Sequence, residues 1–309
     1  MTSHLQSELR MILEELRILH RMTIIKTIQI ILCIAAAFLP QLAQGFSDST
    51  SCIPVKTVKD SELAFGHGES ASFVLHYEWG AINSDVGNAH VRLDSLTFNG
   101  QKAYQCTMHG RTTRLYDLFF KVREDFSSVF TRDGLRPLKF YRHSQEGDYE
   151  AKNTYMYVRT AQQPKIIADL YTSKRGQRSV EIPLTPCTFD LPTLFYFARN
   201  MDFDAVQPGK RYPMTFAIDD DVYNVYFILH GRETLKIKGL GTVRTIKFAA
   251  KLLEGEVFKG EEDMLIWVSD DANRLPVYFE APLIVGVATG RMTAWEGLKY
   301  PFEALVKKK

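Results

Sequence analysis

The sequence lacks the short motifs that mark common catalytic and cofactor sites. It has no G-x-x-x-x-G-K-[ST] loop for phosphate, no H-E-x-x-H zinc motif and no G-x-S-x-G nucleophile elbow. It also has no C-x-x-C pair, and its histidines lack the spacing of metal ligands. We therefore predict no catalytic residues, no metal site and no cofactor, and the sequence favours a protein that is not an enzyme. These absences leave open an enzyme that uses scattered carboxylates.

A large excess of charge of either sign is absent too. The 309 residues carry 38 basic and 36 acidic side chains, a formal net charge of +2. This balance gives no electrostatic reason to bind nucleic acid, so we predict no nucleic-acid partner. The chain is 45% apolar and 24% charged, which is typical of a globular protein that can bury a core.

Cysteine is scarce, with four residues in the chain. Cys33 lies within a predicted signal peptide, which leaves Cys52, Cys106 and Cys187 in the mature protein. An odd number allows one disulfide and one free thiol in an oxidising compartment, and the sequence alone does not pair them.

A short apolar run near the N-terminus predicts export. Ile28–Leu39 is a mainly apolar stretch, shorter than the roughly 20 residues that span a bilayer. Lys26 precedes the run, and Ala43-Gln44-Gly45 follows it with small residues at the −3 and −1 positions of a cleavage site. We predict a signal peptide over 22–45, a flexible leader over 46–60 and a periplasmic or secreted protein. An uncleaved membrane anchor is the alternative.

The first 21 residues do not fit this signal peptide. Leu9, Ile12, Leu13 and Leu16 have helical spacing, and Met22 stands directly before the signal pattern. We interpret residues 1–21 as a mis-assigned start extension, with a functional amphipathic helix as the alternative.

Strand patterns recur from about Leu63 onward, separated by Gly, Asn-Gly or Asp-Gly. Asn99-Gly100 between two such patterns predicts a tight hairpin. Leu118–Phe130 alternates apolar and charged residues, which predicts a strand with one dry face. The predicted strands are 73–79, 89–98, 102–108, 118–130, 137–144, 149–158, 166–171, 179–183, 211–218, 222–230, 233–237, 243–253, 264–269, 277–279 and 286–295.

One segment, Phe189–Phe203, has the pattern of a helix. Asp190 suits the N-cap, Pro192 suits the first turn, and the apolar residues after it have helical spacing. Many strands with one helix predict a mainly β protein, in which a large, strongly curved antiparallel sheet or open β-barrel packs against that helix. We expect a single β-rich domain over 61–300 and a tail over 301–309. Two β-subdomains divided near 185–205 are the alternative.

Two groups of residues are candidates for binding. Aromatic side chains on a concave sheet suit apolar ligands or sugars, which points to Tyr77, Trp79, Phe195 and Trp267 as a ligand-binding set. The same residues also suit an ordinary core. A charged patch is the second candidate, formed by Lys121, Arg123 and Arg142 if their strands are adjacent. A solvated face is the alternative, and the sequence favours it.

The acidic runs are interpreted as turns. Asp219-Asp220-Asp221 lies between two strand patterns without the regular ligand spacing of a calcium loop. Asp270-Asp271-Ala272-Asn273 also follows a strand, and Asp and Asn commonly bond their own backbone in turns.

A series of motifs across the chain resembles a known family. The motifs occur in a fixed order from about Leu63 to Gly297, and their combination is more specific than any one of them. They are FGHGE at 65–69, LFFKVR at 118–123, GTVRTIK at 241–247, GEVFK at 255–259, IWVSDD at 266–271, LPV at 275–277 and IVGVA at 284–288. They resemble the domain of unknown function 3108 family of exported bacterial proteins. The resemblance implies an exported, β-rich protein, and it implies no established activity and no catalytic residues.

Three functions are compatible with these observations. The first is a non-catalytic binding or carrier module for a lipid, an acyl chain, a glycan or another envelope molecule. The second is a structural or assembly factor that contacts envelope proteins. The third is an unrecognised hydrolase of glycans or lipids. A cavity bordered by the predicted helix favours the first, and exposed apolar patches favour the second.

The signal pattern yields the first testable prediction. We expect the envelope-associated protein to begin at or near Phe46, because signal peptidase cleaves after small residues such as Gly45. N-terminal sequencing of protein isolated from the cell envelope measures this directly. An intact Met1 or Met22 on that protein would contradict the prediction.

Overall fold

Alternating apolar and polar side chains produce one sheet, which has sixteen strands in the part of the chain that the structure describes. The computed structural model describes residues 59–160, 163–185, 187–250, 264–283 and 285–308. The predicted start extension, the signal peptide and all but the end of the leader lie outside these residues. The elements are η1 (Asp60–Glu62), β1 (Ser70–Trp79), β2 (Ile82–Phe98), β3 (Gln101–Thr112), α3 (Arg114–Asp117), β4 (Val122–Thr131), β5 (Pro137–Glu146), β6 (Tyr149–Val158), β7 (Lys165–Thr172), β8 (Gly176–Pro183), β9 (Thr188–Phe189), α4 (Leu191–Ala198), β10 (Arg211–Ile218), β11 (Asp221–Ile237), β12 (Gly241–Ala250), β13 (Met264–Ser269), β14 (Pro276–Pro282), β15 (Val287–Glu296) and β16 (Leu305–Lys308).

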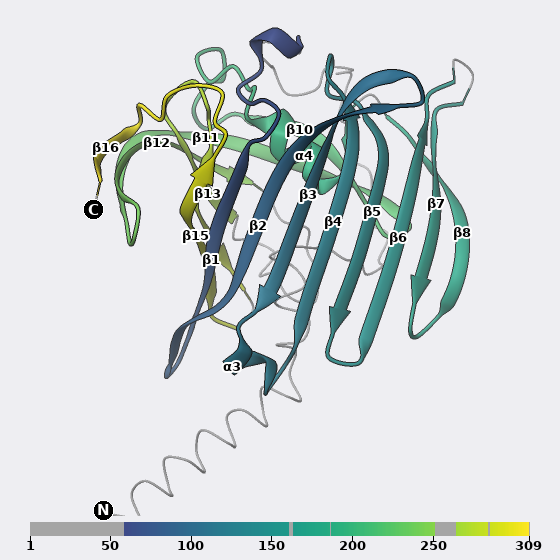
Figure 1. Cartoon of the computed structure of the whole chain (residues 1–309), viewed down its shortest axis with the longest axis horizontal. Coiled ribbons are helices and arrows are strands. Elements are labelled where there is room, and N and C mark those ends of the chain that lie inside the picture. Colours follow the sequence, from purple (N-terminus) through teal and green to yellow (C-terminus); the bar gives the residue numbers. More distant parts are fainter. Residues whose placement is uncertain (1–58, 161–162, 186, 251–263, 284, 309) are drawn as a thin grey trace, which may run out of the picture.

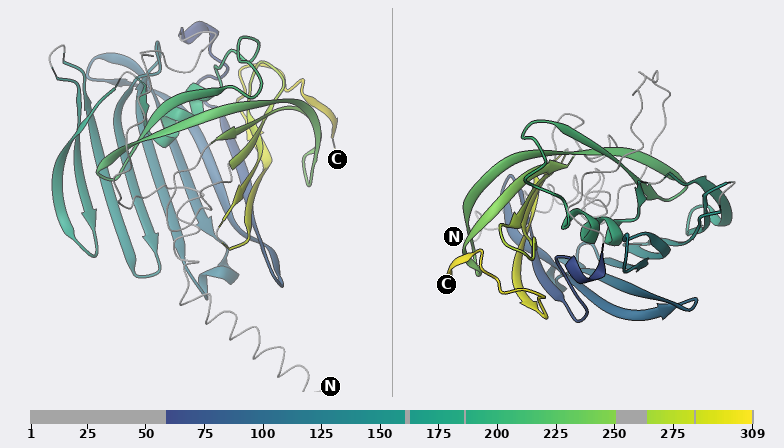
Figure 2. Two further views of the ribbon diagram at one scale, coloured as in Figure 1. Left: turned by 180° about the vertical axis from the view of Figure 1, so that it is seen from behind. Right: turned by 90° about the horizontal axis from the view of Figure 1, so that it is seen from above.

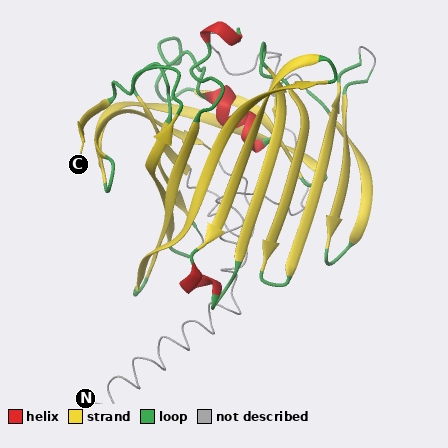
Figure 3. Cartoon of the chain, viewed as in Figure 1, coloured by secondary structure: helices red, strands yellow, loops and turns green. Residues whose placement is uncertain are grey.

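The sheet consists of two series of strands that meet at a seam between β1 and β15. Its order is β8-β7-β6-β5-β4-β3-β2-β1-β15-β14-β13-β12-β11-β10-β9, and β16 also pairs with β12. Almost every neighbouring pair is adjacent in sequence and antiparallel, and the short β9–β10 pair is parallel. Figures 1 and 3 show these strands as one continuous surface, with the helical segments placed against it or at its ends.

The sheet curls until its two halves face each other. Seen from above in Figure 2, β2–β8 form one wall, β10–β12 form another, and α4 lies between them. Side chains join the walls at the β10–β11 turn, where Arg142 Nη1 donates to Asp219 Oδ1 at 3.0 Å. Asn153 Nδ2 donates to the same oxygen at 2.8 Å, and the Tyr155 hydroxyl donates to the Asp219 carbonyl at 2.7 Å. A second pair, Arg178 with Asp220, lies beside them.

The concave face carries the main hydrophobic core. Tyr196 of α4 is buried and contacts Phe65 and Phe130, with ring centroids 4.6 and 5.9 Å away. Phe197 packs on Phe189 at 4.4 Å. Because these side chains fill the space between sheet and helix, α4 is fixed by aromatic contacts on the face that points away from solvent.

Most predicted strands are found with shifts of a few residues at their ends. Asn99 and Gly100 both have positive φ, 49° and 81°, as the predicted tight hairpin requires. The patterns at 222–230 and 233–237 form a single strand, β11, which continues through a register shift at Gly231. β4 begins at Val122 instead of 118, because the chain first turns through α3.

The predicted helix is shorter than its pattern. It covers Leu191–Ala198, while Phe189 belongs to β9. The helix ends because tertiary contacts take over its C-terminus. Asn200 Nδ2 donates to the Tyr196 carbonyl at 2.9 Å, and Asn200 Oδ1 accepts from the Ala64 backbone N–H at 3.0 Å. The predicted fold class, a large curved sheet with one principal helix, is confirmed. Among the described residues, no helix has both the length and the apolar character needed to cross a bilayer.

The contact between the walls generates a stability prediction. Replacing Arg142 by Met leaves Asp219 without its buried partner, which typically lowers the free energy of unfolding by about 3–5 kcal/mol. Arg178→Met is the matched control on the same turn, because its pair with Asp220 is about one third exposed and such pairs contribute about 0–1 kcal/mol. Urea denaturation of both variants measures the difference. Equal losses of unfolding free energy in the two variants would show that the Arg142–Asp219 pair stabilises the fold no more than the exposed pair does.

Candidate functional site

A group of ionisable and polar side chains lies on the concave face, next to the apolar core. Glu124 on β4, Arg142, Ser144 and Glu146 on β5, and Asn153 on β6 are each at most 1% exposed. We call these five residues the concave polar cluster. The alternation of β5 explains the position, because Phe140, which belongs to the core, lies on the same face two residues before Arg142. The inner face of this strand therefore changes from apolar to polar along its length.

The cluster is connected by short hydrogen bonds across neighbouring strands. Glu124 is paired with Ser144, and Arg142 is paired with Asn153, in the register of β4, β5 and β6. The Ser144 hydroxyl donates to Glu124 Oε2 at 2.5 Å, and Arg142 Nε donates to Ser144 Oγ at 2.7 Å. Asp219 extends this network from the opposite wall. Carboxylates accept hydrogen bonds from hydroxyl or ammonium groups, and the neighbouring guanidinium donates to oxygen acceptors, so the cluster suits a polar ligand group.

Sequence reasoning missed the central residue of this network. Asp219 was interpreted as part of a solvated turn, yet its carboxylate binds Arg142 and Asn153. Its φ of 51° places the turn in the left-handed region, which Asp tolerates better than most residues. The turn assignment is correct, but the contact joins residues 77 positions apart, which no local pattern reports.

A second buried network lies at the start of α4. Asp190 caps the helix through a bond from the Thr193 N–H at 2.9 Å. Its other oxygen accepts from Ser128 Oγ at 2.9 Å and from the Tyr157 hydroxyl at 3.0 Å. Burial raises the pKa of the Asp190 carboxyl to about 6, while these hydrogen bonds act to lower it. The Asp190 carboxyl therefore ionises as the pH rises through a mildly acidic range.

A pocket of about 320 Å³ lies beyond the C-terminal end of α4. Arg199, one of the lining residues, forms a buried ion pair with Glu69 and also donates to the Asn273 carbonyl at 2.8 Å. The described residues that line this pocket are Glu62, Ala64, Arg199, Asn200, Met201, Asp202, Phe203, Asp204, Ala272, Arg274 and Tyr300. Because most of these side chains are polar, the pocket does not offer the apolar lining expected for an acyl chain.

The four predicted aromatic residues do not converge on one cavity. Tyr77 and Trp79 belong to a small apolar cluster on the inner face of β1, where the Tyr77 hydroxyl donates to the Val285 carbonyl at 2.8 Å. Burial raises the pKa of Tyr77 to about 12. Phe195 packs against the other, larger cluster and contacts Tyr196 with ring centroids 5.2 Å apart. None of these residues lines the pocket beyond α4.

Trp267 lies on the opposite face of the sheet from Tyr77. The register pairs it with Tyr278, then Arg291, then Val74, and directly paired residues share a face. Since Val74 and Tyr77 are three residues apart in one strand, their side chains point to opposite faces. Lys247 Nζ stands 4.8 Å from the Trp267 ring, and the indole N–H donates to Glu233.

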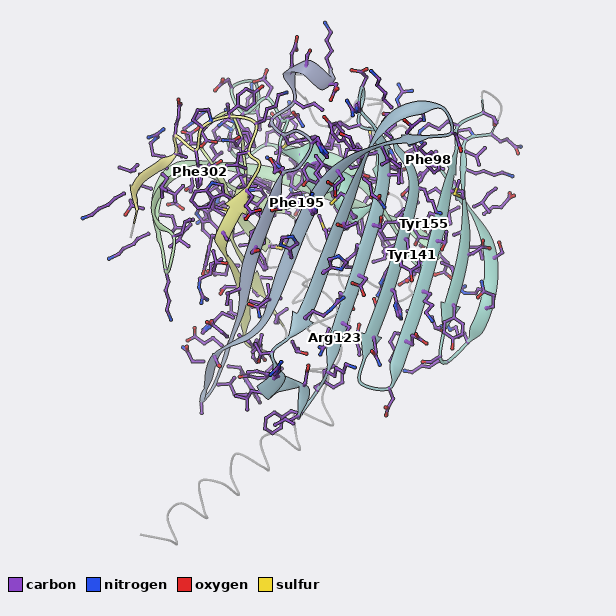
Figure 4. All side chains as sticks on the ribbon, in the orientation of Figure 1. Phe98, Arg123, Tyr141, Tyr155, Phe195 and Phe302 are labelled. Atoms are coloured by element: carbon purple, nitrogen blue, oxygen red, sulfur yellow. The ribbon has the colours of Figure 1, made fainter. Side chains whose placement is uncertain are left out.

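The predicted charged patch is also divided between two faces. Arg142 points into the concave face, whereas Arg123 lies on the outer face and binds Asp117. Lys121 precedes β4 and is exposed. Figure 4 labels Arg123 beside α3, at the opposite end of the sheet from Phe195. The three cations therefore do not form one patch. Side chains alternate between the two faces along each strand, so Arg123 and Arg142 lie on opposite faces of the sheet although their strands are neighbours.

Cys106 is buried with a free thiol, and Cys187 is disulfide-bonded, which excludes a bond between these two residues. Cys52 lies outside the described residues. Within the residues that the structure describes, no group of three His, Cys, Asp or Glu side chains is arranged to hold a metal ion.

Comparison with known proteins gives a family and a fold. The model of the DUF3108 family, "Protein of unknown function (DUF3108)", matches residues 72–293. No match was found among curated proteins. The fold is similar to that of a β-barrel-like protein of the domain of unknown function DUF1849 from Brucella abortus, with a TM-score of 0.50 and 11% identity over 75% of this chain and 98% of that chain. A candidate lipoprotein from Parabacteroides distasonis matches with a TM-score of 0.28 and 9% identity, over 80% of this chain and 100% of that chain.

The Asp190 cap generates a pH prediction. A carboxyl whose pKa is raised on folding, from about 3.9 to about 6, favours the native state fully below about pH 4, and this contribution decreases as the pH rises through 6. Asp190→Asn keeps a neutral cap at every pH. The stability of wild type relative to this variant should therefore fall by about 2 kcal/mol between pH 4 and pH 7.

Urea unfolding at several pH values measures this difference, and the comparison of two proteins cancels the contribution of all other titrating groups. Parallel stability profiles for wild type and Asp190→Asn would contradict the raised pKa.

Proposed function

The chain belongs to the DUF3108 family, and from this premise we propose that it is an exported, non-catalytic module that binds an amphiphilic molecule of the cell envelope. The ligand is a lipid or a similar molecule with a polar head group. The observation that carries this proposal is the concave polar cluster, which adjoins the apolar core on the same face of one curved sheet.

The charges of the cluster indicate the kind of head group. The carboxylates of Glu124, Glu146 and the neighbouring Asp219 accept hydrogen bonds and the guanidinium of Arg142 donates them, so this region suits a polar head group that both donates and accepts. An apolar core gains nothing from buried ions, and replacing a buried ion pair by well-packed apolar residues is often neutral or stabilising. Burying these ionisable side chains costs free energy and does not favour folding over an apolar core. Recognition of a ligand therefore explains their position on the inner face better than stability does.

Export of the protein rests on the signal pattern at Lys26, Ile28–Leu39 and Ala43-Gln44-Gly45. A periplasmic or secreted location supports the choice of an envelope molecule as ligand. It also agrees with a disulfide at Cys187, since disulfides persist in oxidising compartments.

An assembly factor for envelope proteins is the second candidate. Its basis is a set of exposed apolar side chains, Leu115 in α3 and Leu118 and Phe119 directly after it. The unrecognised hydrolase receives no specific support from the geometry, and it is not proposed.

Native mass spectrometry of the protein isolated from its own envelope tests the proposal. We expect a bound small molecule on the wild type and its loss from Glu124→Gln/Ser144→Ala, which removes the acceptor and the hydroxyl that link β4 to β5. The matched control is Glu150→Gln/Ser127→Ala, which changes the same residue types on the outer face of β6 and β4. Circular dichroism checks that both variants are folded.

A bound mass that survives in Glu124→Gln/Ser144→Ala would exclude this cluster as the site. A bound protein in place of a small molecule would favour the assembly factor. A wild-type protein without any bound mass would contradict the carrier function.

A further inference from the structure

A small apolar tip protrudes from the sheet between β3 and β4. Leu115 is 62% exposed, Leu118 79% and Phe119 53%. Large apolar side chains with this exposure are normal when scattered, but here three of them occur within five residues. We call the segment from Arg114 to Lys121 the α3 tip. Figure 1 shows α3 at the lower end of the sheet, away from α4 and the main core.

The tip is held firmly although its apolar side chains face outward. The Asp117 N–H donates to the Thr113 carbonyl at 2.9 Å, and the Phe120 N–H donates to the Tyr116 carbonyl at 2.8 Å. The Asp117 carboxylate accepts from Thr112 Oγ1 at 2.5 Å and from Arg123 Nη1 at 2.9 Å. These bonds fix the backbone turn, so the exposure of the leucines and of Phe119 is a property of the folded structure.

The tip is also positively charged. Arg114 and Lys121 stand at its two ends, and no acidic side chain of the described residues pairs with either of them. Asp117 is the acid within the segment, and Arg123 neutralises it, which also holds the pKa of Asp117 below its usual range. The tip therefore presents three apolar side chains between two cations.

The tip lies beside the end of the sheet that carries the concave polar cluster. The Gly147 N–H, directly after Glu146 at the end of β5, donates to the Lys121 carbonyl at 2.9 Å. Val122, the first residue of β4, pairs with Glu146 in the sheet. A surface contacted by the tip would therefore be close to this end of the concave face.

We propose that the α3 tip docks on an anionic lipid bilayer, with its apolar side chains in the interface and its cations on the head groups. Exposed leucine and phenylalanine beside basic residues match the interface between acyl chains and anionic head groups. A second protein is a poorer match, because stable protein interfaces bury about 800 Å² per partner and three side chains on a narrow turn do not supply such an area. This inference does not rest on the proposed ligand.

Vesicle binding of the exported protein tests the proposal. We expect binding to vesicles of phosphatidylglycerol and phosphatidylethanolamine, weaker binding to phosphatidylcholine alone, and a decrease with salt because surface charges are screened. Leu118→Ser/Phe119→Ser should lower the partition coefficient at least tenfold. Arg114→Gln/Lys121→Gln should lower it on anionic vesicles and abolish most of the salt dependence.

The matched control removes two other exposed apolar residues. Met156 and Ile167 are each 37% exposed and face each other across β6 and β7. Met156→Ser/Ile167→Ser should bind vesicles as the wild type does. Equal loss in this control, unchanged binding by Leu118→Ser/Phe119→Ser, or no binding of the wild type at low salt would each overturn the proposal.

A local probe gives a second measurement that does not depend on any other membrane contact of the chain. Leu118→Cys can be labelled with an environment-sensitive dye, because Cys106 is buried and Cys187 is disulfide-bonded. We expect the emission from position 118 to shift to the blue on anionic vesicles, and that from Ile167→Cys to remain unchanged. An unchanged spectrum at 118 would place the tip outside the bilayer, and a shift caused by an added protein fraction instead of vesicles would identify it as a protein-docking surface.

Discussion

The pairing of Arg142 with Asp219 joins the two walls of the curled sheet through buried side-chain contacts. In the described part of the chain, a sheet of sixteen strands twists and curls, and the strands at the two ends of its order, β8 and β9, are not hydrogen-bonded to each other. Backbone ladders alone would leave the two walls free to open. The turn between β10 and β11 places Asp219 against the inner faces of β5 and β6. Side-chain hydrogen bonds there join the two walls, which no backbone ladder of the described strands connects directly.

Closure by side chains gives the interior two different environments. Above the turn, α4 fills the concave face with aromatic rings, and Asp190 joins the helix to β4 and β6 through Ser128 and Tyr157. Toward the other end of β4 and β5, the same face is polar. Buried polar groups are tolerated where their hydrogen bonds are satisfied, and each such bond also fixes the register of the strands that carry it. The buried polar residues therefore make one end of the interior hydrophilic. Their hydrogen bonds also favour this one curved arrangement of the strands.

The contrast between the apolar and the polar part of the concave face also explains which features could be predicted from the sequence. Alternation located the strands well because it depends on local chemistry, and β6, β10 and β13 have the predicted bounds. Alternation also shows that neighbouring residues point to opposite faces, but it identifies the buried face only when that face is apolar. Arg142 lies on a buried face that has become polar, so it was grouped with the exposed Lys121. The helix was predicted too long because Asn200 ends it through a contact with Ala64, which is distant in sequence.

The seam between β1 and β15 determines the order in which the protein can be completed. Nearly all other ladders join strands that are consecutive in the chain, so each hairpin can form as soon as its second strand is available. β1 finds its second neighbour only when residues 287–296 have left the ribosome and reached the same compartment. Until then one side of β1 is an open edge, which is a template for pairing with other chains. Truncation before β15 would therefore expose the ten-residue edge of β1 in an otherwise continuous sheet.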